Sequence, residues 1–283
     1  MTVMESTKET QNQATMEEEI EPNKDLSEGG IACDNALAAR SFVDLYTECV
    51  MEMNDPKQEK YNGTTMLILG SSGCGKTTLL RYLLNEFYAK KPCPNGANWI
   101  CLFFTSTSDS DALQGIDKMK NVILCNTLEE DMVEWCKRLQ DKFGKAATKL
   151  SFLIILDDMV SIRYKKMIER CLLTFRNSNI SSIICMQYLK HVPPSIRSSI
   201  YFIVSLSSIN LANIQLLIDT YFSNAIPGKN NREKVRAYAS HCSERGKGFF
   251  SDNLRGGDVY TLEPQGKPGS SYVCRKMVNQ LLS

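Results

Sequence analysis

The chain has 283 residues, of which 43% are hydrophobic and 23% charged, and its formal net charge is +1. This length and composition suit one large globular domain or two modest ones. No apolar run is long enough for a membrane-spanning helix, and the first residues lack the basic-then-apolar profile of a signal peptide. We therefore expect a soluble, intracellular protein with no membrane partner.

The small net charge hides an asymmetry along the chain. The first 30 residues carry eight acidic and two basic side chains, so the remainder of the chain is mildly basic. Such a body suits a polyanionic partner without identifying one. The eleven cysteines are scattered, and several sit inside apolar runs. This distribution favours buried, reduced thiols over a disulfide framework.

The chain begins with a polar stretch. Residues 1–35 are rich in Glu, Thr, Gln and Asn, and they offer too little apolar surface to offset the entropy of ordering. We expect a disordered acidic tail there. Residues 36–53 then place apolar side chains at helical spacing, which predicts a helix. We expect a folded core over residues 36–226 and a basic extension of the same domain over residues 227–283.

The most informative stretch is residues 64–80, TTMLILGSSGCGKTTLL, which read as strand, glycine-rich turn and helix start. Residues 70–77 match G-x-x-x-x-G-K-[ST] at every fixed position, so we predict that the chain binds ATP or a related triphosphate. Successive backbone N–H groups would form an anion nest, with Lys76 on the β- and γ-phosphates and Thr77 on Mg²⁺. The predicted nucleotide-binding residues are Gly70, Ser71, Ser72, Gly73, Cys74, Gly75, Lys76, Thr77 and Thr78.

The rest of the chain alternates between strand and helix patterns. Buried-strand patterns cover residues 98–104, 122–125, 151–158, 180–186, 201–206 and 258–262. Helical patterns cover residues 76–89, 127–143, 161–176, 210–223 and 272–282. This alternation predicts an α/β fold of the phosphate-loop NTPase type, with a doubly wound, mainly parallel sheet flanked by helices.

Polar side chains end two of the predicted buried strands. Asp157 and Asp158 close an unbroken apolar run, at the edge where open α/β sheets bind ligands. Asp157 is the natural second Mg²⁺ anchor, and Asp158 could orient or deprotonate an attacking water. Gln187 ends the next strand, and its amide could donate to phosphate while accepting from water, provided that this strand lies between the other two. The alternatives are helix capping for the acidic pair and a loop start for Gln187.

Two arginines are candidates for stabilising charge on a transferred phosphoryl group, often from a neighbouring subunit. Arg197 follows the Pro193-Pro194 break, and Arg176 is the second candidate. A surface or structural role fits either side chain about equally well.

Taken together, GSSGCGKT, LIILDD, FRNSNISSIICMQ and PPSIRSSI resemble segments of the poxvirus-type genome-packaging ATPases of the FtsK/HerA superfamily. The resemblance covers about residues 60–210. It implies an ATP-driven, ring-forming motor that moves double-stranded DNA into a preformed viral capsid, in the virion or at the viral assembly site. It also implies that Lys76, Thr77 and Asp157 bind Mg-ATP, with Asp158 as catalytic carboxylate, Gln187 as sensor and Arg197 as a finger acting in trans. Much of the superfamily has Glu where this chain has the shorter Asp158.

Residues 227–283 carry ten basic and five acidic side chains. A motor that grips the DNA backbone needs Lys and Arg toward its channel, so we expect part of this segment to line the pore. A solvated basic surface is the equally weighted alternative. The clustered side chains are Lys229, Arg232, Lys234, Arg236, Arg245, Lys247 and Arg255.

Three other functions remain open at this stage. A nucleotide or small-molecule kinase also uses a phosphate loop, but no arginine-rich lid follows it before residue 150. A GTPase-like switch would need N-K-x-D, which is not present. A DNA helicase of related architecture would share every motif named above. Stimulation by duplex DNA, by a nucleoside acceptor or by forked DNA would discriminate among these functions.

Overall fold

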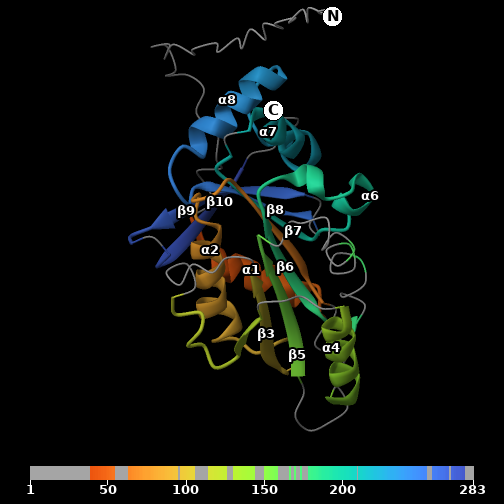
Figure 1. Ribbon diagram of the computed structural model, residues 1–283. Coiled ribbons are helices and arrows are strands. Elements are labelled where there is room, and N and C mark those ends of the chain that lie inside the picture. The colour runs from red at the N-terminus through yellow and green to blue at the C-terminus, as the bar shows by residue number, and fades with distance from the viewer. Residues whose placement is uncertain are drawn as a thin grey trace, which may run out of the picture. The chain divides into compact units, whose positions relative to one another are not determined.

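The computed structural model describes residues 39–54, 63–94, 96–105, 114–125, 130–143, 150–158, 166, 169, 173, 178–208, 210–253, 257–267 and 269–277 (Figure 1). The tail expected over residues 1–35 lies outside these ranges. So do Arg176, Arg255 and most of the helix expected over residues 161–176. None of the helices in the described ranges is long and apolar enough to cross a membrane.

Ten strands of the described residues form one sheet, in the order β1-β10-β9-β8-β7-β2-β6-β5-β3-β4. The strands from β7 to β4 in this order are all parallel to one another. Their bounds are β7 Phe202–Leu206, β2 Thr65–Leu69, β6 Ser181–Met186, β5 Leu150–Asp157, β3 Asn98–Thr105 and β4 Val122–Cys125. The parallel part of the sheet therefore holds both the phosphate-loop strand and the acidic strand, with β6 between them.

The other strands extend the same sheet in antiparallel fashion beyond β7. Their bounds are β8 Gly248–Asp252, β9 Asp258–Gln265, β10 Ser271–Lys276 and β1 Arg40–Ser41. Residues 248–276 are thus joined to the core through backbone hydrogen bonds between β7 and β8.

Helices cover both faces of the sheet. Their bounds are α1 Phe42–Glu52, α2 Lys76–Leu83, α4 Glu130–Phe143, α6 Pro194–Arg197, α7 Leu211–Leu217 and α8 Asn231–His241. A π-helical turn extends α2 over Leu84–Tyr88 (η1), and another extends α7 over Ile218–Phe222 (η5). A 3₁₀ turn, η4, spans Leu189–His191.

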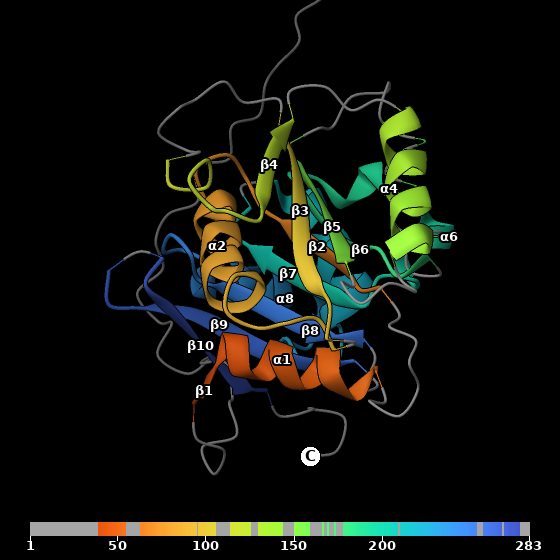
Figure 2. The same ribbon diagram turned by 90° about the horizontal axis from the view of Figure 1, so that it is seen from below.

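Two hydrophobic clusters follow from the alternation of side chains along the strands. Met66 and Ile68 of β2 point to one face and pack in a cluster with residues of α1, α2 and η1. Leu67 and Leu69 point to the other face, where residues of α4, α7, η5 and α8 join the cluster. Figure 2 shows α1 and α2 on one side of the central strands and α4 on the other. Both faces of β2 are buried, which explains its unbroken apolar sequence.

The predicted fold class is confirmed, and two predicted elements are corrected. Residues 271–276 form strand β10, although a closing helix was expected over residues 272–282. Tyr272 and Cys274, two positions apart, are buried, and the strand pairs with β9. The segment therefore buries every second side chain, as a strand does, although its apolar residues also fit a helical pattern. The helix expected over residues 36–53 begins only at Phe42, because Arg40 and Ser41 pair with β10. The Ser41 side chain then accepts a hydrogen bond from Asp44 N as helix cap.

Candidate nucleotide site

The phosphate loop connects β2 to α2 and is tied to two neighbouring strands. Gly70 N donates to Met186 O at the end of β6 (3.2 Å), and Ser71 N donates to Ser207 O after β7 (2.8 Å). A side chain at Gly70 would place its Cβ only 2.4 Å from the Cys74 sulfur. Gly75 precedes α2 with φ 108°, a conformation that favours glycine. The sequence thus folds into a tight turn that leads directly into the N-terminus of α2, where a helix can bind an anion.

Lys76 is buried at the start of α2, with 6% of its surface exposed. Its Nζ donates to the carbonyl oxygens of Gly70 (3.0 Å) and Ser71 (3.1 Å) and lies 3.9 Å from Asp158 Oδ1. The ammonium group therefore lies over the loop and is satisfied by the loop's own carbonyl oxygens. A phosphate bound in the turn would offer it stronger, charged acceptors.

Asp157 ends β5 and faces the start of α2. The Thr77 hydroxyl donates to Asp157 Oδ2 at 3.3 Å. Burial, together with the neighbouring charge of Asp158, raises the pKa of Asp157 to about 6, although Lys76 and Thr77 act in the opposite direction. This carboxylate is therefore held in an apolar setting beside a second negative charge, where a cation would stabilise it.

The chemistry of Asp157 and Thr77 fits Mg²⁺. Asp157 Oδ1 is buried and has no hydrogen-bond partner within the described ranges. A carboxylate and a hydroxyl oxygen are ligands of the kind that Mg²⁺ prefers, with substrate phosphates and water completing its shell. The two side chains predicted as metal ligands thus lie together, and Asp157 Oδ1 is available to bind the ion.

Asp158 leaves the strand in a left-handed conformation, with φ 50°. Its N–H donates to Cys185 O of β6 (3.2 Å), which holds the turn in place. A non-glycine residue rarely adopts this conformation, and such strain gathers at functional sites. The turn brings the carboxylate toward Lys76 rather than extending it along the strand.

Gln187 lies directly after Met186, whose carbonyl binds the phosphate loop. The condition set by the sequence is met, because β6 pairs with both β2 and β5. Gln187 is partly exposed at this edge of the sheet. The structure therefore brings Lys76, Thr77, Asp157, Asp158 and the Gln187 backbone to the carboxyl end of three adjacent strands.

Arg197 lies elsewhere. It ends α6, just before β7 begins, and the neighbouring Ser199 O and Tyr201 N both bond to the Thr65 hydroxyl at the start of β2. The phosphate loop follows the other end of β2, about 15 Å away for a strand of this length. Arg197 is thus at the amino edge of the parallel strands and cannot reach a phosphate held by its own chain.

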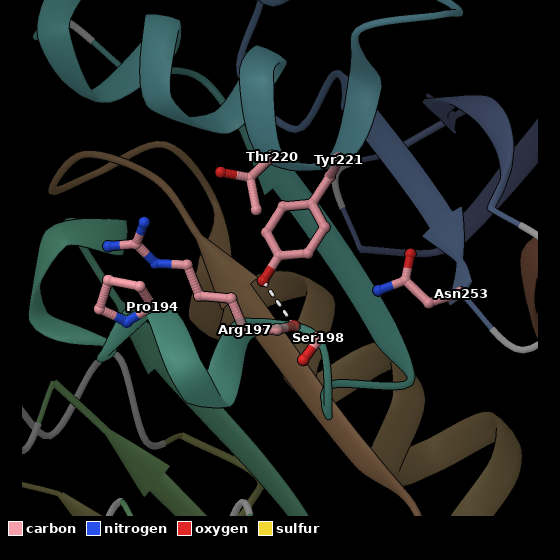
Figure 3. Close-up of a pocket in the computed structure, with 6 residues that line it drawn as sticks. All are labelled: Pro194, Arg197, Ser198, Thr220, Tyr221 and Asn253. Carbon is pink, nitrogen blue, oxygen red and sulfur yellow. Dashed lines mark hydrogen bonds between the residues drawn. The ribbon is translucent and has the colours of Figure 1, made fainter.

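The surroundings of Arg197 fix its backbone and leave its guanidinium near the surface. Arg197 Nε donates to Val192 O (3.0 Å), and the Tyr221 hydroxyl donates to Arg197 O (3.0 Å). Arg197 and Tyr221 line an open depression of about 390 Å³. Figure 3 shows the Tyr221 hydroxyl directed at the Arg197 backbone, with the hydrogen bond to Arg197 O. The residues that line it are Pro194, Arg197, Ser198, Thr220, Tyr221 and Asn253.

A comparison with protein families identifies the group to which this site belongs. Residues 55–224 match the model of the family described as Poxvirus A32 protein. The chain belongs to this family. The match spans the phosphate loop, the acidic strand, Gln187 and Arg197, so it confirms the poxvirus-type packaging ATPase resemblance seen in the sequence.

Solved structures give more distant likenesses to this A32-family chain. The genome packaging NTPase B204 of Sulfolobus turreted icosahedral virus 2, in complex with AMP, has 13% identity, with 75% of this chain and 100% of that chain covered and a TM-score of 0.47. EssC (ATPases 2 and 3) of Geobacillus thermodenitrificans has 10% identity, with coverage of 76% and 40% and a TM-score of 0.47. No curated protein matches the chain significantly.

Two parts of the site had no signal in the sequence. Asn213 of α7 is buried; its Oδ1 accepts from Leu189 N (2.9 Å) and its Nδ2 donates to Gln187 O (3.4 Å), which fixes the segment after β6. Gly246 N donates to Cys74 O (3.1 Å), which places the loop after α8 against the phosphate loop. Both contacts join residues far apart in the chain, so no local motif could reveal them.

Proposed function

We propose that this A32-family protein is an ATP-driven motor that moves double-stranded DNA and packages a viral genome into a preformed capsid. One observation mainly supports the proposal. In a chain of this family, the phosphate loop is surrounded by the side chains of Lys76, Thr77, Asp157 and Asp158. A homo-oligomeric ring, a capsid protein as partner, and action at the viral assembly site belong to the proposal.

Each residue of the site has its own role in binding or hydrolysing ATP. The loop N–H groups bind the phosphates, and Lys76 exchanges the carbonyls of Gly70 and Ser71 for phosphate oxygens. Mg²⁺ held by Thr77 and Asp157 would supply charge neutralisation at the β- and γ-phosphates. Asp158 orients the attacking water and accepts its proton, while the Gln187 amide contacts both water and phosphate. Arg197 serves the site of the neighbouring subunit.

ATP hydrolysis measured with and without duplex DNA tests this function. We expect duplex DNA to raise turnover in the wild type. Lys76→Ala should abolish ATP binding, and Asp158→Asn should bind ATP yet hydrolyse it at least about 100-fold more slowly, because a neutral amide cannot accept the proton. Forked DNA, which a helicase would unwind, and a nucleoside acceptor, which a kinase would phosphorylate, serve as comparison substrates.

Three results would contradict the proposal. Turnover that rises with a nucleoside acceptor but not with DNA would identify a kinase. Strand separation on forked DNA would identify a helicase. Slow turnover insensitive to DNA, together with a partner that binds in only one nucleotide state, would identify a switch.

A further inference from the structure

The loop between α8 and β8 lies directly on the phosphate loop. Gly246 N donates to Cys74 O, and the Gly246 Cα and N lie 3.6 Å from the position that a Cβ on Gly75 would occupy. Gly246 itself is buried. A segment about 170 positions later in the chain therefore touches the residue that directly precedes α2, where a triphosphate would sit.

Strands β9 and β10 hold this loop in place. A Cβ on Gly246, whose φ is 86°, would lie 3.5 Å from a Pro264 ring carbon and 3.7 Å from the Tyr272 hydroxyl. Burial raises the pKa of Tyr272 to about 12, and the positive charges of Arg245 and Arg81 oppose that rise. Arg245 therefore lies close enough to Tyr272 for its charge to act on that hydroxyl.

Arg245 is the basic side chain that this arrangement places beside the phosphate loop. Its Cγ lies 3.9 Å from the Cβ position of Gly75. The residue is exposed, and no carboxylate in the described part of the chain forms a salt bridge with it. Lys247, two positions later, differs because its Nζ is 2.9 Å from Glu244 Oε1. Among the described residues, Arg245 therefore has no carboxylate partner beside the phosphate loop, whereas the charge of Lys247 is paired with Glu244.

We propose that Arg245 binds the phosphate chain of the nucleotide held by its own subunit. This inference rests on the proposed function, because it concerns the same site, and it removes Arg245 from the group of basic residues expected to line a DNA pore. A guanidinium group suits the task, since its planar fork can donate two parallel hydrogen bonds to phosphate oxygens. Arg245 and Arg197 would then serve two different nucleotides, one in cis and one in trans.

Nucleotide affinity of the full chain tests the inference. Displacement of a fluorescent ATP analogue by ATP, ADP and AMP is measured for the wild type, Arg245→Ala, Arg245→Lys and Lys247→Ala. We expect Arg245→Ala to bind ATP and ADP about tenfold more weakly, which is about 1.4 kcal/mol, with little change for AMP. Arg245→Lys should recover part of the affinity, and Lys247→Ala should match the wild type.

Duplex DNA affinity, measured on the same variants, separates the phosphate role from the pore role. Unchanged DNA binding by Arg245→Ala supports the inference. Unchanged ATP affinity in Arg245→Ala, equal weakening for AMP and ATP, or an equal weakening in Lys247→Ala would overturn it. Should the wild type bind ATP without any DNA-stimulated hydrolysis, the motor function fails, while the affinity comparison still decides the role of Arg245.

Discussion

Asp157 and Asp158 place two like charges at the end of a buried strand. A single substitution can distinguish the folding stability lost through this charge pair from its role in binding Mg²⁺. Asp157 is 4% exposed, and burial together with Asp158 raises its pKa to about 6. The ionised form is therefore less favourable in the folded chain than in the unfolded one. The free energy of unfolding therefore falls as pH rises from about 4 through about 6. The ionised carboxylate that causes this loss is the form that can bind a cation.

Asp157→Asn should therefore stabilise the nucleotide-free protein and impair the Mg²⁺-dependent step. We expect a rise of about 3 kcal/mol in unfolding free energy at pH 8, which disappears toward pH 4, where the wild-type carboxyl is protonated. Thermal unfolding in EDTA at both pH values measures the first effect, and the Mg²⁺ dependence of ATP turnover measures the second. Asp131→Asn, on the exposed surface of α4, is the matched control. Equal stability of Asp157→Asn and the wild type at pH 8 would show that the ionised Asp157 does not destabilise the folded protein.

Residues at the site differ in how far the sequence could specify them. The phosphate loop is local, so its spacing alone predicts how Gly75, Lys76 and Thr77 are arranged. The positions of Asp157 and Gln187 follow from the rule that parallel strands end at one edge of the sheet. Asn213 and Arg245 reach the site through contacts between distant segments, and no pattern of neighbouring residues encodes such contacts.

At the scale of elements, the parallel and antiparallel parts of the sheet were predictable to different degrees. Strands buried on both faces, such as β5 and β6, are continuous apolar runs and were predicted to within about one residue. Strands β8 and β10 contain Ser, Asp, Arg or Lys among their apolar residues and lack an unbroken apolar run, so their sequences did not stand out. A helix was predicted over residues 272–282, and the pairing of β10 with β9 shows a strand over residues 271–276 instead.

Helix α8 displays basic side chains that suit contact with a DNA backbone. Arg232 and Arg236 are exposed and four positions apart, so they share one face of the helix. No salt bridge joins either residue to a carboxylate within the described ranges. In contrast, Lys234 lies on another side and donates to the Ser223 carbonyl. The two arginines are therefore the side chains of α8 best placed to neutralise phosphates.

We expect the double variant Arg232→Glu/Arg236→Glu to bind duplex DNA more weakly while its ATP affinity stays unchanged. The slope of log affinity against log salt should fall by about 2, one unit for each phosphate that an arginine no longer neutralises. Binding of fluorescent duplex DNA across a salt series measures this slope. Lys276→Glu is the control, because Lys276 forms an ion pair with Asp258 away from α8. An unchanged slope in the double variant would assign α8 to a solvated surface.

At the scale of the whole molecule, the proposed role of Arg197 concerns a second chain, because this residue lies at the opposite end of β2 from its own phosphate loop. In a ring of identical subunits, the amino edge of one sheet can face the nucleotide of the next subunit, as heterologous contacts allow. The site of each chain would then be complete only at an interface. Tyr221 and Val192 fix the Arg197 backbone and Nε, so its terminal nitrogens are presented from a rigid support.

Mixing two inactive variants tests this arrangement. Arg197→Ala keeps a sound phosphate loop but offers no arginine, and Asp158→Asn offers the arginine but lacks the carboxylate. Each alone should have at least about 100-fold less DNA-stimulated activity than the wild type. In rings assembled from equal amounts, an active interface needs an Arg197→Ala site beside an Asp158→Asn neighbour, so about one quarter of interfaces should recover. Arg197→Lys in place of Arg197→Ala tests the need for a planar fork, because lysine keeps the charge alone. If the mixture stays as inactive as its components although mixed rings form, Arg197 does not act across the interface, and its contacts with Val192 and Tyr221 would then describe a structural role.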